Sequence, residues 1–392
     1  MIIANMMSAT KLEESTELAQ GVSVIIPTYG RPVLCEELLA SLKQSQAYCL
    51  VPTEIWVVDD SPILDDALSI RASCQSAGAQ YARFTGSVAE KRNWGAKKAQ
   101  YIILLFVDSD CIATQSLIQS HWISYQENPK QSAAVGRTEF VGERNWLWQV
   151  VELSPYLNAF FAYDCYPLLW GASNNLSCRQ ADFMQIGGFD EFSPRPHGSE
   201  DVDFGYQLYY KDKLMLSCPE ATIYHSTQTW KTLREVLLRL IRWSRGEAYI
   251  IERYWSELYY DCPSRYGCVL LLTILGIVLA LLSNQIAWLF SPFSFLIVNF
   301  SFALLLRLFD KPKYIKRTVQ LIAAEALVLF YETALSYHFI AKKLYLKPFF
   351  TCLLIRPKDA LAEWNSRTFE MGRRFLEIST SGLIIYNWIY RV

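Results

Sequence analysis

The 392-residue sequence has no excess of charge of either sign, since 37 Lys and Arg residues face 38 Asp and Glu residues, for a formal net charge of −1. A protein that binds nucleic acid needs a basic surface, so this balance predicts no nucleic-acid partner. Charged residues are also sparse, at 19%, whereas hydrophobic residues make up 52%. This shift indicates contact with a membrane, and the apolar residues concentrate late in the chain.

Signals of several other protein classes are absent as well. The ten cysteines form no C-x-x-C pair and no Cys/His cluster with the spacing of a zinc site, and this usage indicates a reduced, cytosolic environment. No G-x-G-x-x-G follows the first predicted strand, which argues against a nicotinamide-dependent oxidoreductase. Residues 1–20 carry acidic side chains and no long apolar stretch, so we expect a leader segment and no secretory signal.

Strand-like and helix-like segments alternate between residues 21 and 229. In chain order, the strand-like runs and the segments with helical spacing between them are 22–26, 33–45, 54–58, 87–100 and 101–107. Such alternation is typical of a mostly parallel sheet with helices on its faces. We therefore expect an α/β domain over residues 21–229.

Two carboxylates, Asp108 and Asp110, follow the apolar run that ends at Val107. Open α/β sheets bind ligands at the carboxyl ends of their strands. Carboxylates are hard oxygen ligands, suited to Mg²⁺ or Mn²⁺ that also carries substrate phosphates. The pair therefore predicts a metal that holds a diphosphate, while Asp and Ser are also ordinary turn residues after a strand.

Further polar motifs follow one another along the same domain. They are Pro27-Thr-Tyr29, Asp59-Asp60, Lys91-Arg92-Asn93, Gly171-Ala-Ser-Asn-Asn175, Gly187-Gly-Phe-Asp-Glu191 and Ser199-Glu-Asp-Val-Asp203. Together with the Asp108/Asp110 pair, in this order and spacing, they resemble the family 2 glycosyltransferases over roughly residues 21–245. The resemblance implies a GT-A fold, which is Rossmann-like with a mostly parallel sheet, and an enzyme that transfers a sugar from a nucleotide-sugar with inversion.

The resemblance assigns the nucleotide side of the site to the first half of the domain. It implies that Pro27, Thr28 and Tyr29 shape the loop around the nucleoside. It also implies that Asp60 hydrogen-bonds the base and that Arg92 lies near the nucleotide and the diphosphate. UDP is the family's commonest donor nucleotide, so a UDP-sugar is the expected donor.

The resemblance also implies a metal centre that uses Mn²⁺ or Mg²⁺. Asp110 would bind the metal directly, and Asp108 would face both the ribose and the metal. His225 lies where many relatives place a histidine near the metal or the diphosphate. A divalent cation suits the chemistry independently, because the leaving nucleoside diphosphate develops negative charge.

The acceptor side of the site falls in the second half of the domain. By the resemblance, the residues lining the sugar and the acceptor are Gly171, Asn174, Asn175 and Glu200. The general base of the family corresponds to Asp201, and an acceptor hydroxyl does need a carboxylate to take its proton as it attacks. We expect like-charge repulsion from Glu200 and Asp203 to raise the pKa of Asp201 toward neutral pH.

Several of these residues also have ordinary structural interpretations. Asp60 can be a turn residue at a strand end, and Asp201 can be a helix N-cap. Arg92 can be a solvated charge at a helix end, and His225 a structural histidine. The ordered set of motifs, and not any one of them, favours the functional interpretation.

Residues 230–262 form a basic amphipathic segment, with apolar residues at helical spacing and basic residues between them. This pattern predicts a helix that lies on a membrane surface, packs on the preceding domain, or does both with different faces. Within it, Arg239-Leu-Ile-Arg-Trp243 resembles the Gln-x-x-Arg-Trp signature of processive polysaccharide synthases, with Arg in place of Gln. Trp243 is therefore a candidate for stacking on the acceptor sugar, or an interfacial anchor.

Residues 263–345 contain three apolar segments. Residues 266–306 carry no charge and break naturally near residue 284, which predicts spans near 266–283 and 286–306. The loop 307–317 holds five basic residues and one acidic residue, so the positive-inside rule makes it cytoplasmic. Two spans then place the N-terminal domain on the cytoplasmic side as well.

The third apolar segment, 318–340, differs because it contains Glu325 and Glu332 on one helical face, with basic residues following it. It is either a third span or an interfacial or re-entrant helix, and the sequence leaves the number of spans beyond two open. Residues 346–392 form the C-terminal tail.

These patterns predict a metal-dependent, inverting glycosyltransferase of hexosyltransferase type in the inner or plasma membrane. It would be a multi-pass protein whose catalytic domain faces the cytoplasm and contacts membrane lipid. It would transfer a sugar to a hydroxyl of a lipid-linked or growing glycan. The alternatives are a processive polysaccharide synthase and an inactive membrane scaffold that binds nucleotide-sugar.

Overall fold

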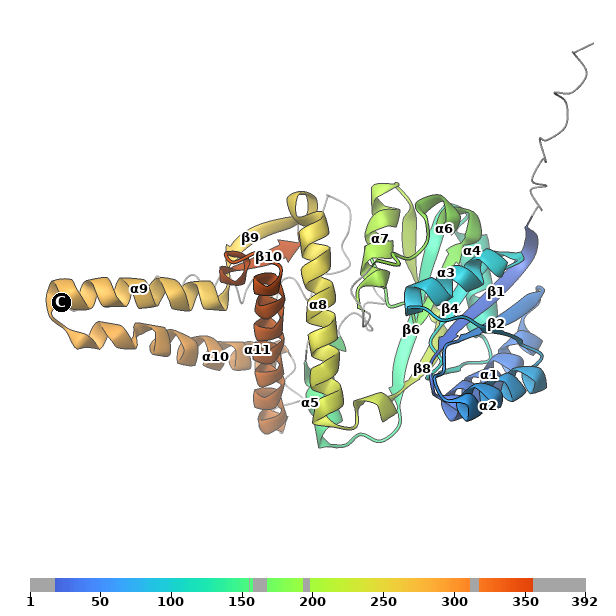
Figure 1. The fold of residues 1–392 in the computed structure, drawn as a ribbon, viewed down its shortest axis with the longest axis horizontal. Helices are drawn as coiled ribbons and strands as arrows, with labels where there is room; N and C mark the ends of the chain where they lie inside the picture. Colours follow the sequence, from blue (N-terminus) through green and yellow to red (C-terminus); the bar gives the residue numbers. More distant parts are fainter. Residues whose placement is uncertain (1–17, 155, 158–167, 193–197, 311–316, 355–392) are drawn as a thin grey trace, which may run out of the picture.

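The computed structural model describes residues 18–154, 156–157, 168–192, 198–310 and 317–354, so most of the expected leader and tail lies outside the described residues. The N-terminal half is built on one sheet of eight strands, in the order β3-β2-β1-β4-β7-β6-β8-β5 (Figure 1). The strands are β1 (Ala19–Thr28), β2 (Thr53–Asp59), β3 (Gln80–Arg83), β4 (Tyr101–Val107), β5 (Cys111–Ala113), β6 (Gln131–Val141), β7 (Asn175–Arg179) and β8 (Leu214–Ser226).

The sheet is mostly parallel, as expected. Strands β3, β2, β1 and β4 run in one direction, and β6 and β8 share it. Strand β7 is antiparallel to both of its neighbours, and β5 is antiparallel to β8. Because β7 is reversed, its first residue, Asn175, pairs with Val107 at the end of β4. The loop that precedes β7 therefore reaches the same edge of the sheet as the Asp108/Asp110 pair.

Helices cover both faces of the sheet, which explains why its central strands are apolar on both sides. One core contains residues of α1 (Pro32–Tyr48), α2 (Leu64–Ala77) and α4 (Leu117–Glu127). The other contains residues of α3 (Val88–Lys98), α6 (Gln180–Ile186) and α7 (Glu200–Tyr210). Side chains alternate along β1, so that Val24 and Ile26 enter the first core and Ile25 enters the second.

Helix α3 is fixed on the sheet at both a cap and a close contact. Ser87 and Glu90 form a reciprocal capping box at its start. Gly95 lies directly on β1, where an added Cβ would come 2.6 Å from Cγ2 of Ile25. This close approach places Lys91 and Arg92, one turn earlier, beneath the carboxyl edge of the sheet.

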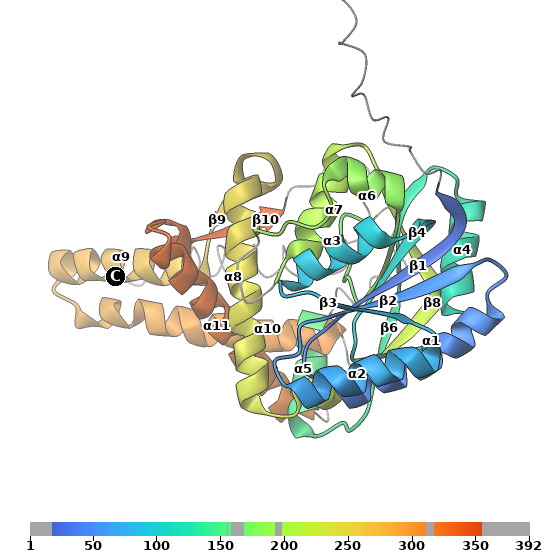
Figure 2. The same ribbon diagram turned by 45° about the vertical axis from the view of Figure 1, so that its right-hand side comes forward.

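The C-terminal half is helical. Its elements, together with α5 and η2, which lead into it, are α5 (Trp146–Leu153), η2 (Thr227–Trp230), α8 (Leu233–Leu258), β9 (Tyr259–Pro263), α9 (Arg265–Ser283), η3 (Ile286–Phe290), α10 (Ser291–Asp310), α11 (Thr318–Ala341), η5 (Lys347–Phe349) and β10 (Phe350–Leu354). Helices α9 and α10 form a hairpin that extends away from the sheet, and α8 and α11 lie between the hairpin and the sheet (Figures 1 and 2).

The predicted membrane segments agree with these helices in part. The segment expected at 266–283 is the single helix α9, whereas the one expected at 286–306 begins as the 3₁₀ helix η3 and becomes α-helical only at Ser291. Among the described residues, α9 and α11 are long and apolar enough to cross a membrane. The expected boundaries at residues 229, 262 and 345 stay predictions.

Candidate active site

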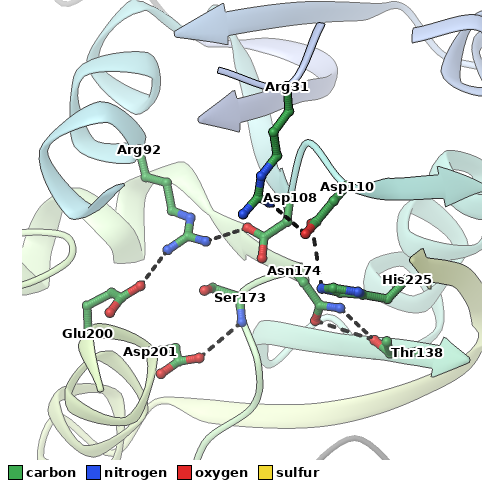
Figure 3. Close-up of polar contacts among 10 residues, drawn as sticks. All are labelled: Arg31, Arg92, Asp108, Asp110, Thr138, Ser173, Asn174, Glu200, Asp201 and His225. Atoms are coloured by element: carbon green, nitrogen blue, oxygen red, sulfur yellow. Dashed lines mark hydrogen bonds and ion pairs between the residues drawn. The ribbon is translucent and has the colours of Figure 1, made fainter. Parts of the chain in front are cut away.

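Charged side chains from distant parts of the chain meet at the carboxyl edge of the sheet (Figure 3). Arg31 follows β1, and the Asp108/Asp110 pair follows β4. Arg92 comes from α3, Glu200 and Asp201 open α7, and His225 lies near the end of β8. The structure therefore brings together the metal, base and basic residues that the motif order predicted.

Asp110 is almost fully buried and lies between two cationic or potentially cationic side chains. Its Oδ2 accepts a hydrogen bond from Nη1 of Arg31 at 2.7 Å, and its Oδ1 lies 3.5 Å from Nε2 of His225. The pairing of β5 with β8 sets this geometry, because Cys111 is directly opposite His225. Burial raises the pKa of Asp110, but His225, Arg31 and Arg239 outweigh it and leave that pKa below its usual range.

The residues around Asp110 fit a divalent cation. Ligand atoms of Asp110, Cys111 and His225 lie within 4.8 Å of one another. Burial, with the charges of Asp110 and Asp108, raises the pKa of the Cys111 thiol well above its usual value. Nδ1 of His225 lies 3.1 Å from the carbonyl oxygen of Ser226, which suits a tautomer whose Nε2 is free to bind metal. A carboxylate and an imidazole suit Mn²⁺ or Mg²⁺, with Asp108 beside them.

Arg92 is buried and bonded to two carboxylates. Its Nη2 donates to Asp108 at 2.7 Å and its Nη1 donates to Glu200 at 2.9 Å, while the guanidinium carbon lies 5.4 Å from the ring centroid of Phe189. Burial disfavours the charge, but Asp108, Glu200 and Asp201 hold the pKa of Arg92 above its usual value. Sequence reasoning missed this pairing. It makes Arg92 a link between residues 108–110, which we call the metal loop, and α7. Its expected place near the diphosphate stays a prediction.

Asp201 has the protonation behaviour of a base at neutral pH. Its Oδ1 accepts from the Val202 amide at 2.9 Å, and its Oδ2 accepts from the Ser173 amide at 3.4 Å. Burial and the negative charge of Glu200 raise the pKa of Asp201 to about 7, against the opposing effect of Arg92. The expected effect of Glu200 is therefore present.

Asp203 does not face Asp201 in the way its place in the motif suggested. It is fully buried and turned toward α8, where it accepts a hydrogen bond from the Tyr254 hydroxyl at 2.7 Å and pairs with Arg253 at 3.1 Å. Arg253 also pairs with Asp190, at 2.6 Å. These contacts join α7 and the Gly-Gly-Phe-Asp-Glu loop to α8, so Asp203 has a structural position.

The turn before Asp201 is strained and is held by α8. Ser199 has a φ of 81°, in the left-handed region that disfavours side chains. Gly246 of α8 packs against Gly198, and an added Cβ on Gly246 would lie 2.4 Å from the Gly198 carbonyl oxygen. Only a glycine permits this approach, so α8 contributes directly to the shape of residues 198–201, which we call the base loop.

The side chain of Asn175, which was expected to line the sugar, packs between strands of the sheet. Asn175 is fully buried, and its amide nitrogen donates to the carbonyl oxygens of Arg137 at 3.0 Å and Ala221 at 2.8 Å. Its amide oxygen lies 2.9 Å from Nε2 of His121. Asn175 thus joins β7 to β6 and β8, and its expected contact with the sugar stays a prediction.

Gly171 and Asn174 complete this loop. An added Cβ on Gly171 would lie 2.3 Å from Cγ2 of Val135, so glycine is needed there for packing. The Asn174 side chain is buried, and its amide nitrogen donates to the Thr138 hydroxyl at 3.1 Å. The group of this loop that contacts the site is the backbone amide of Ser173, which donates to Asp201.

The two adjacent acids after β2, which were expected on the nucleotide side of the site, have different environments. Asp59 is fully buried and accepts hydrogen bonds from Ser61, Tyr81 and Arg83. Asp60 is half-buried and accepts only one long bond, 3.3 Å from the Gly86 amide, among the contacts described for it. Asp60 therefore has fewer hydrogen bonds than Asp59 among the described contacts, and its expected bond to the base stays a prediction.

The loop after β1 is arranged around Lys91. The Lys91 ammonium donates to the Thr28 carbonyl oxygen at 2.8 Å and lies 5.8 Å from the centroid of the exposed Tyr29 ring. The buried Thr28 hydroxyl has no hydrogen-bond partner within the described part of the chain. Pro27 is an internal strand residue, paired with Val58. Of these residues, Tyr29 is exposed, and the expected contact of the loop with a nucleoside stays a prediction.

Helix α8 adds two arginines that sequence reasoning did not place in the metal site. The guanidinium of Arg239 stacks 3.9 Å from the centroid of the Trp230 ring. Burial, with the charges of Arg242 and Arg31, lowers the pKa of Arg239 to about 10 against the effect of Asp110, so it remains charged at neutral pH. The charges of Arg31, Arg239 and Arg242 thus act on one another near Asp110. The Arg-Leu-Ile-Arg-Trp motif is the sequence signal from which the two arginines of α8 could have been found.

Trp243 occupies a half-buried position in a different cluster. Its ring lies edge-on to Trp230 at 5.7 Å, and it packs on the core shared by α5, α8 and α11. An added Cβ on Gly198 would lie 3.5 Å from Cδ1 of Trp243, so the ring also borders the base loop. Its position is compatible with an anchoring role, and stacking on an acceptor sugar stays a prediction.

Comparison with known proteins defines the class of this site. Residues 23–188 match the family model described as glycosyl transferase family 2. Validoxylamine A glucosyltransferases from Streptomyces hygroscopicus subsp. jinggangensis (strain 5008) and subsp. limoneus are each 28% identical over 223 residues, which is 48% of this chain and 51% and 48% of theirs. The matched range covers most of the domain that carries the motifs, and it agrees with the family that they resemble. The chain spans about half the length of these curated relatives.

The solved structures that the chain matches have low sequence identity and TM-scores below 0.5. The crystal structure of S. aureus TarS is 18% identical with a TM-score of 0.42, covering 61% of this chain and 44% of that one. The mannosyltransferase PcManGT from Pyrobaculum calidifontis, in complex with GDP-Man and Mn²⁺, is 16% identical with a TM-score of 0.43, covering 63% and 69%. GalNAc-T7 with UDP, GalNAc and Mn²⁺ is 15% identical with a TM-score of 0.45, covering 62% and 49%.

The Arg31–Asp110 pair predicts two substitutions with opposite effects on metal binding. Asp110→Asn removes the carboxylate charge, so Mn²⁺ should bind at least about tenfold more weakly. Arg31→Gln removes the guanidinium that competes for Asp110, so Mn²⁺ should bind more tightly. Titration followed by electron paramagnetic resonance measures both. Equal affinity in the wild type and in Asp110→Asn would contradict the metal assignment.

Proposed function

We propose that the protein is a metal-dependent, inverting hexosyltransferase at the cytoplasmic membrane face. It transfers a sugar from a nucleotide-sugar, with a UDP-sugar as the first candidate, to a hydroxyl of a lipid-linked or growing glycan. The observation that carries this proposal is Asp201, a carboxyl with a pKa of about 7 at the same sheet edge as the Asp108/Asp110 pair. A single displacement needs a base that takes the proton of the acceptor and a site that holds the leaving diphosphate. Both would lie at this edge of the sheet.

The residues divide the chemistry between them. The ionised Asp201 accepts the proton of the acceptor hydroxyl while the hydroxyl oxygen attacks the anomeric carbon. The bond from that carbon to the diphosphate oxygen breaks, and the nucleoside diphosphate leaves with the electron pair. One displacement inverts the anomeric centre, so no carboxylate nucleophile is needed.

Positive charges lie where the diphosphate of the donor would leave. A divalent cation held by Asp110 and His225, beside Asp108, would supply electrostatic stabilisation of the phosphate oxygens. Arg31, Arg239 and Arg242 repel one another beside Asp110, and a polyanion relieves that repulsion. Fixed charges of this kind stabilise negative charge that develops as the glycosidic bond breaks.

Two features support the choice of sugar and the membrane setting. The curated relatives are glucosyltransferases, which makes glucose the first sugar to test. Helix α8 borders the base loop through Gly246 and belongs to the apolar C-terminal half. A site walled by such a helix suits an acceptor presented at a membrane surface.

A donor screen on detergent-solubilised, full-length protein tests the proposed activity. UDP-, GDP- and dTDP-sugars are supplied with Mn²⁺ or Mg²⁺, with and without EDTA, and free nucleoside diphosphate is measured. We expect release from one donor, with UDP-glucose leading, and loss of release with EDTA. Absence of both release and metal-dependent donor binding would favour the inactive scaffold. Long polymeric products after acceptor addition would favour the processive synthase.

Asp201→Asn separates donor binding from catalysis. The change keeps the size of the side chain and removes its basicity, so turnover should fall by about 10²–10⁴-fold. Affinity for the donor nucleotide, measured by calorimetry, should stay unchanged. Asp65→Asn, an exposed position on α2, makes the same chemical change away from the site and should leave turnover intact. Wild-type turnover in Asp201→Asn would exclude this residue as the base.

The raised pKa of Asp201 predicts the pH dependence. Below about pH 7 the carboxyl is protonated and cannot accept a proton, so kcat/KM should rise with pH and level off above that value. In Glu200→Gln the rising limb should move to lower pH, because the charge of Glu200 raises the pKa of Asp201. A limb that stays in place in this variant would assign the titration to another group.

A further inference from the structure

Helix α11 is apolar and long enough to cross a membrane, yet its two ends are bonded to α5 and α8, the helices that border the catalytic domain. At its start, Nη1 of Arg317 lies 3.3 Å from Oε2 of Glu152 on α5. Just beyond its end, Lys342 forms an ion pair with Glu252 on α8. A helix of 24 residues is about 36 Å long, which exceeds the roughly 30 Å of a hydrocarbon core. A transmembrane helix of that length separates its ends, whereas these ends meet elements of one domain.

Between its two ends, α11 also contacts α8 and the residues around α5 along its length. The Tyr156 hydroxyl donates to the Leu327 carbonyl oxygen at 3.3 Å, and a ring nitrogen of His338 lies 3.3 Å from the Ile241 carbonyl oxygen. Tyr331 is bonded to Glu247. The apolar residues of α11 that share one core with α5 and α8 are Leu321, Ala324 and Leu327. The buried face of α11 therefore belongs to a protein core.

The hairpin of α9 and α10 has the opposite character. Large apolar residues are exposed along its length, among them Leu271, Leu281, Leu282, Ile286 and Phe293. Helix α9 has 19 residues and is about 28 Å long, close to the thickness of a hydrocarbon core. In Figures 1 and 2 the hairpin projects away from the sheet and carries its turn at the far end. Such a surface suits lipid chains.

A buried ion-pair cluster joins the hairpin to α11. Arg265, at the start of α9, is buried and lies 3.1 Å from Glu325 and 3.5 Å from Glu332. Helix α9 thus begins against the middle of α11 and leaves it at a steep angle (Figures 1 and 2). Charged groups are costly deep in a bilayer, so this junction belongs at the level of the interface.

We propose that α8 and α11 form a platform along the membrane surface, and that only the α9–α10 hairpin enters the bilayer. This inference rests on the proposed membrane attachment. The hairpin crosses twice, and α11 does not cross. The second crossing then returns the chain to the catalytic side, where Arg317, at the start of α11, can contact anionic headgroups. The platform also places the base loop, through Gly246 of α8, next to the lipid surface.

Single added cysteines test this arrangement in the full-length protein. Lys130→Cys marks the catalytic domain, Asn284→Cys marks the hairpin turn and Lys343→Cys marks the end of α11; all three positions are exposed. Right-side-out and inside-out membrane vesicles are treated with a membrane-impermeant maleimide that shifts the protein on a gel. The unsubstituted protein, with its own cysteines, gives the background. We expect Lys343→Cys to react in the same vesicles as Lys130→Cys, and Asn284→Cys to react only in the other kind.

The outcomes separate the inference from the proposed attachment. Reaction of Lys343→Cys on the same side as Asn284→Cys would show that α11 crosses, and would overturn the platform while leaving membrane attachment intact. Reaction of all three on one side would overturn the two crossings. Recovery of the protein in the soluble fraction after an alkaline wash would overturn the membrane attachment itself, and with it the inference.

Discussion

The site depends on one buried guanidinium. Arg92 comes from a helix fixed to β1 by the close approach of Gly95, and it joins Asp108 to Glu200. Breaking a buried pair of this kind costs on the order of 3–5 kcal/mol, because the remaining charges are left uncompensated. Loss of Arg92 would leave two acids facing each other beside Asp201. The metal loop and the base loop are thus held together by one charge, which also limits how far the pKa of Asp201 rises.

Helix α8 belongs to the site as much as to the apolar half of the chain. It presses Gly246 against the strained turn at Ser199 and binds Asp203 through Tyr254. It also directs Arg239 toward Asp110. Helix α8 therefore connects the apolar helices directly to the turn before Asp201. If the proposed function holds, a change in the packing of α8 would reach Asp201 through direct contacts.

The sequence predicted the sheet, its edge and most of the site, because strand ends in a parallel sheet converge and each motif followed a recognisable strand or helix. It did not predict what depends on side chains meeting across long separations. The Arg92–Glu200 and Arg31–Asp110 pairs are examples, since neither partner carries a local signal of the other. Nor does the motif around Asn175 reveal that its side-chain amide donates to two backbone carbonyl oxygens, which buried backbone groups need.

The same limit applies to the apolar helices. Hydropathy counts side chains along a segment and contains no information about what covers them, so α9 and α11 look alike in the sequence. Their charges distinguish them: α11 carries Glu325 and Glu332, and a glutamate at bilayer depth needs a partner. Arg265 is that partner, and it stands at the entrance of the hairpin. A paired acid on an apolar helix is better explained by a helix that packs on protein, with its ion pair at the water-facing level, than by one that crosses lipid.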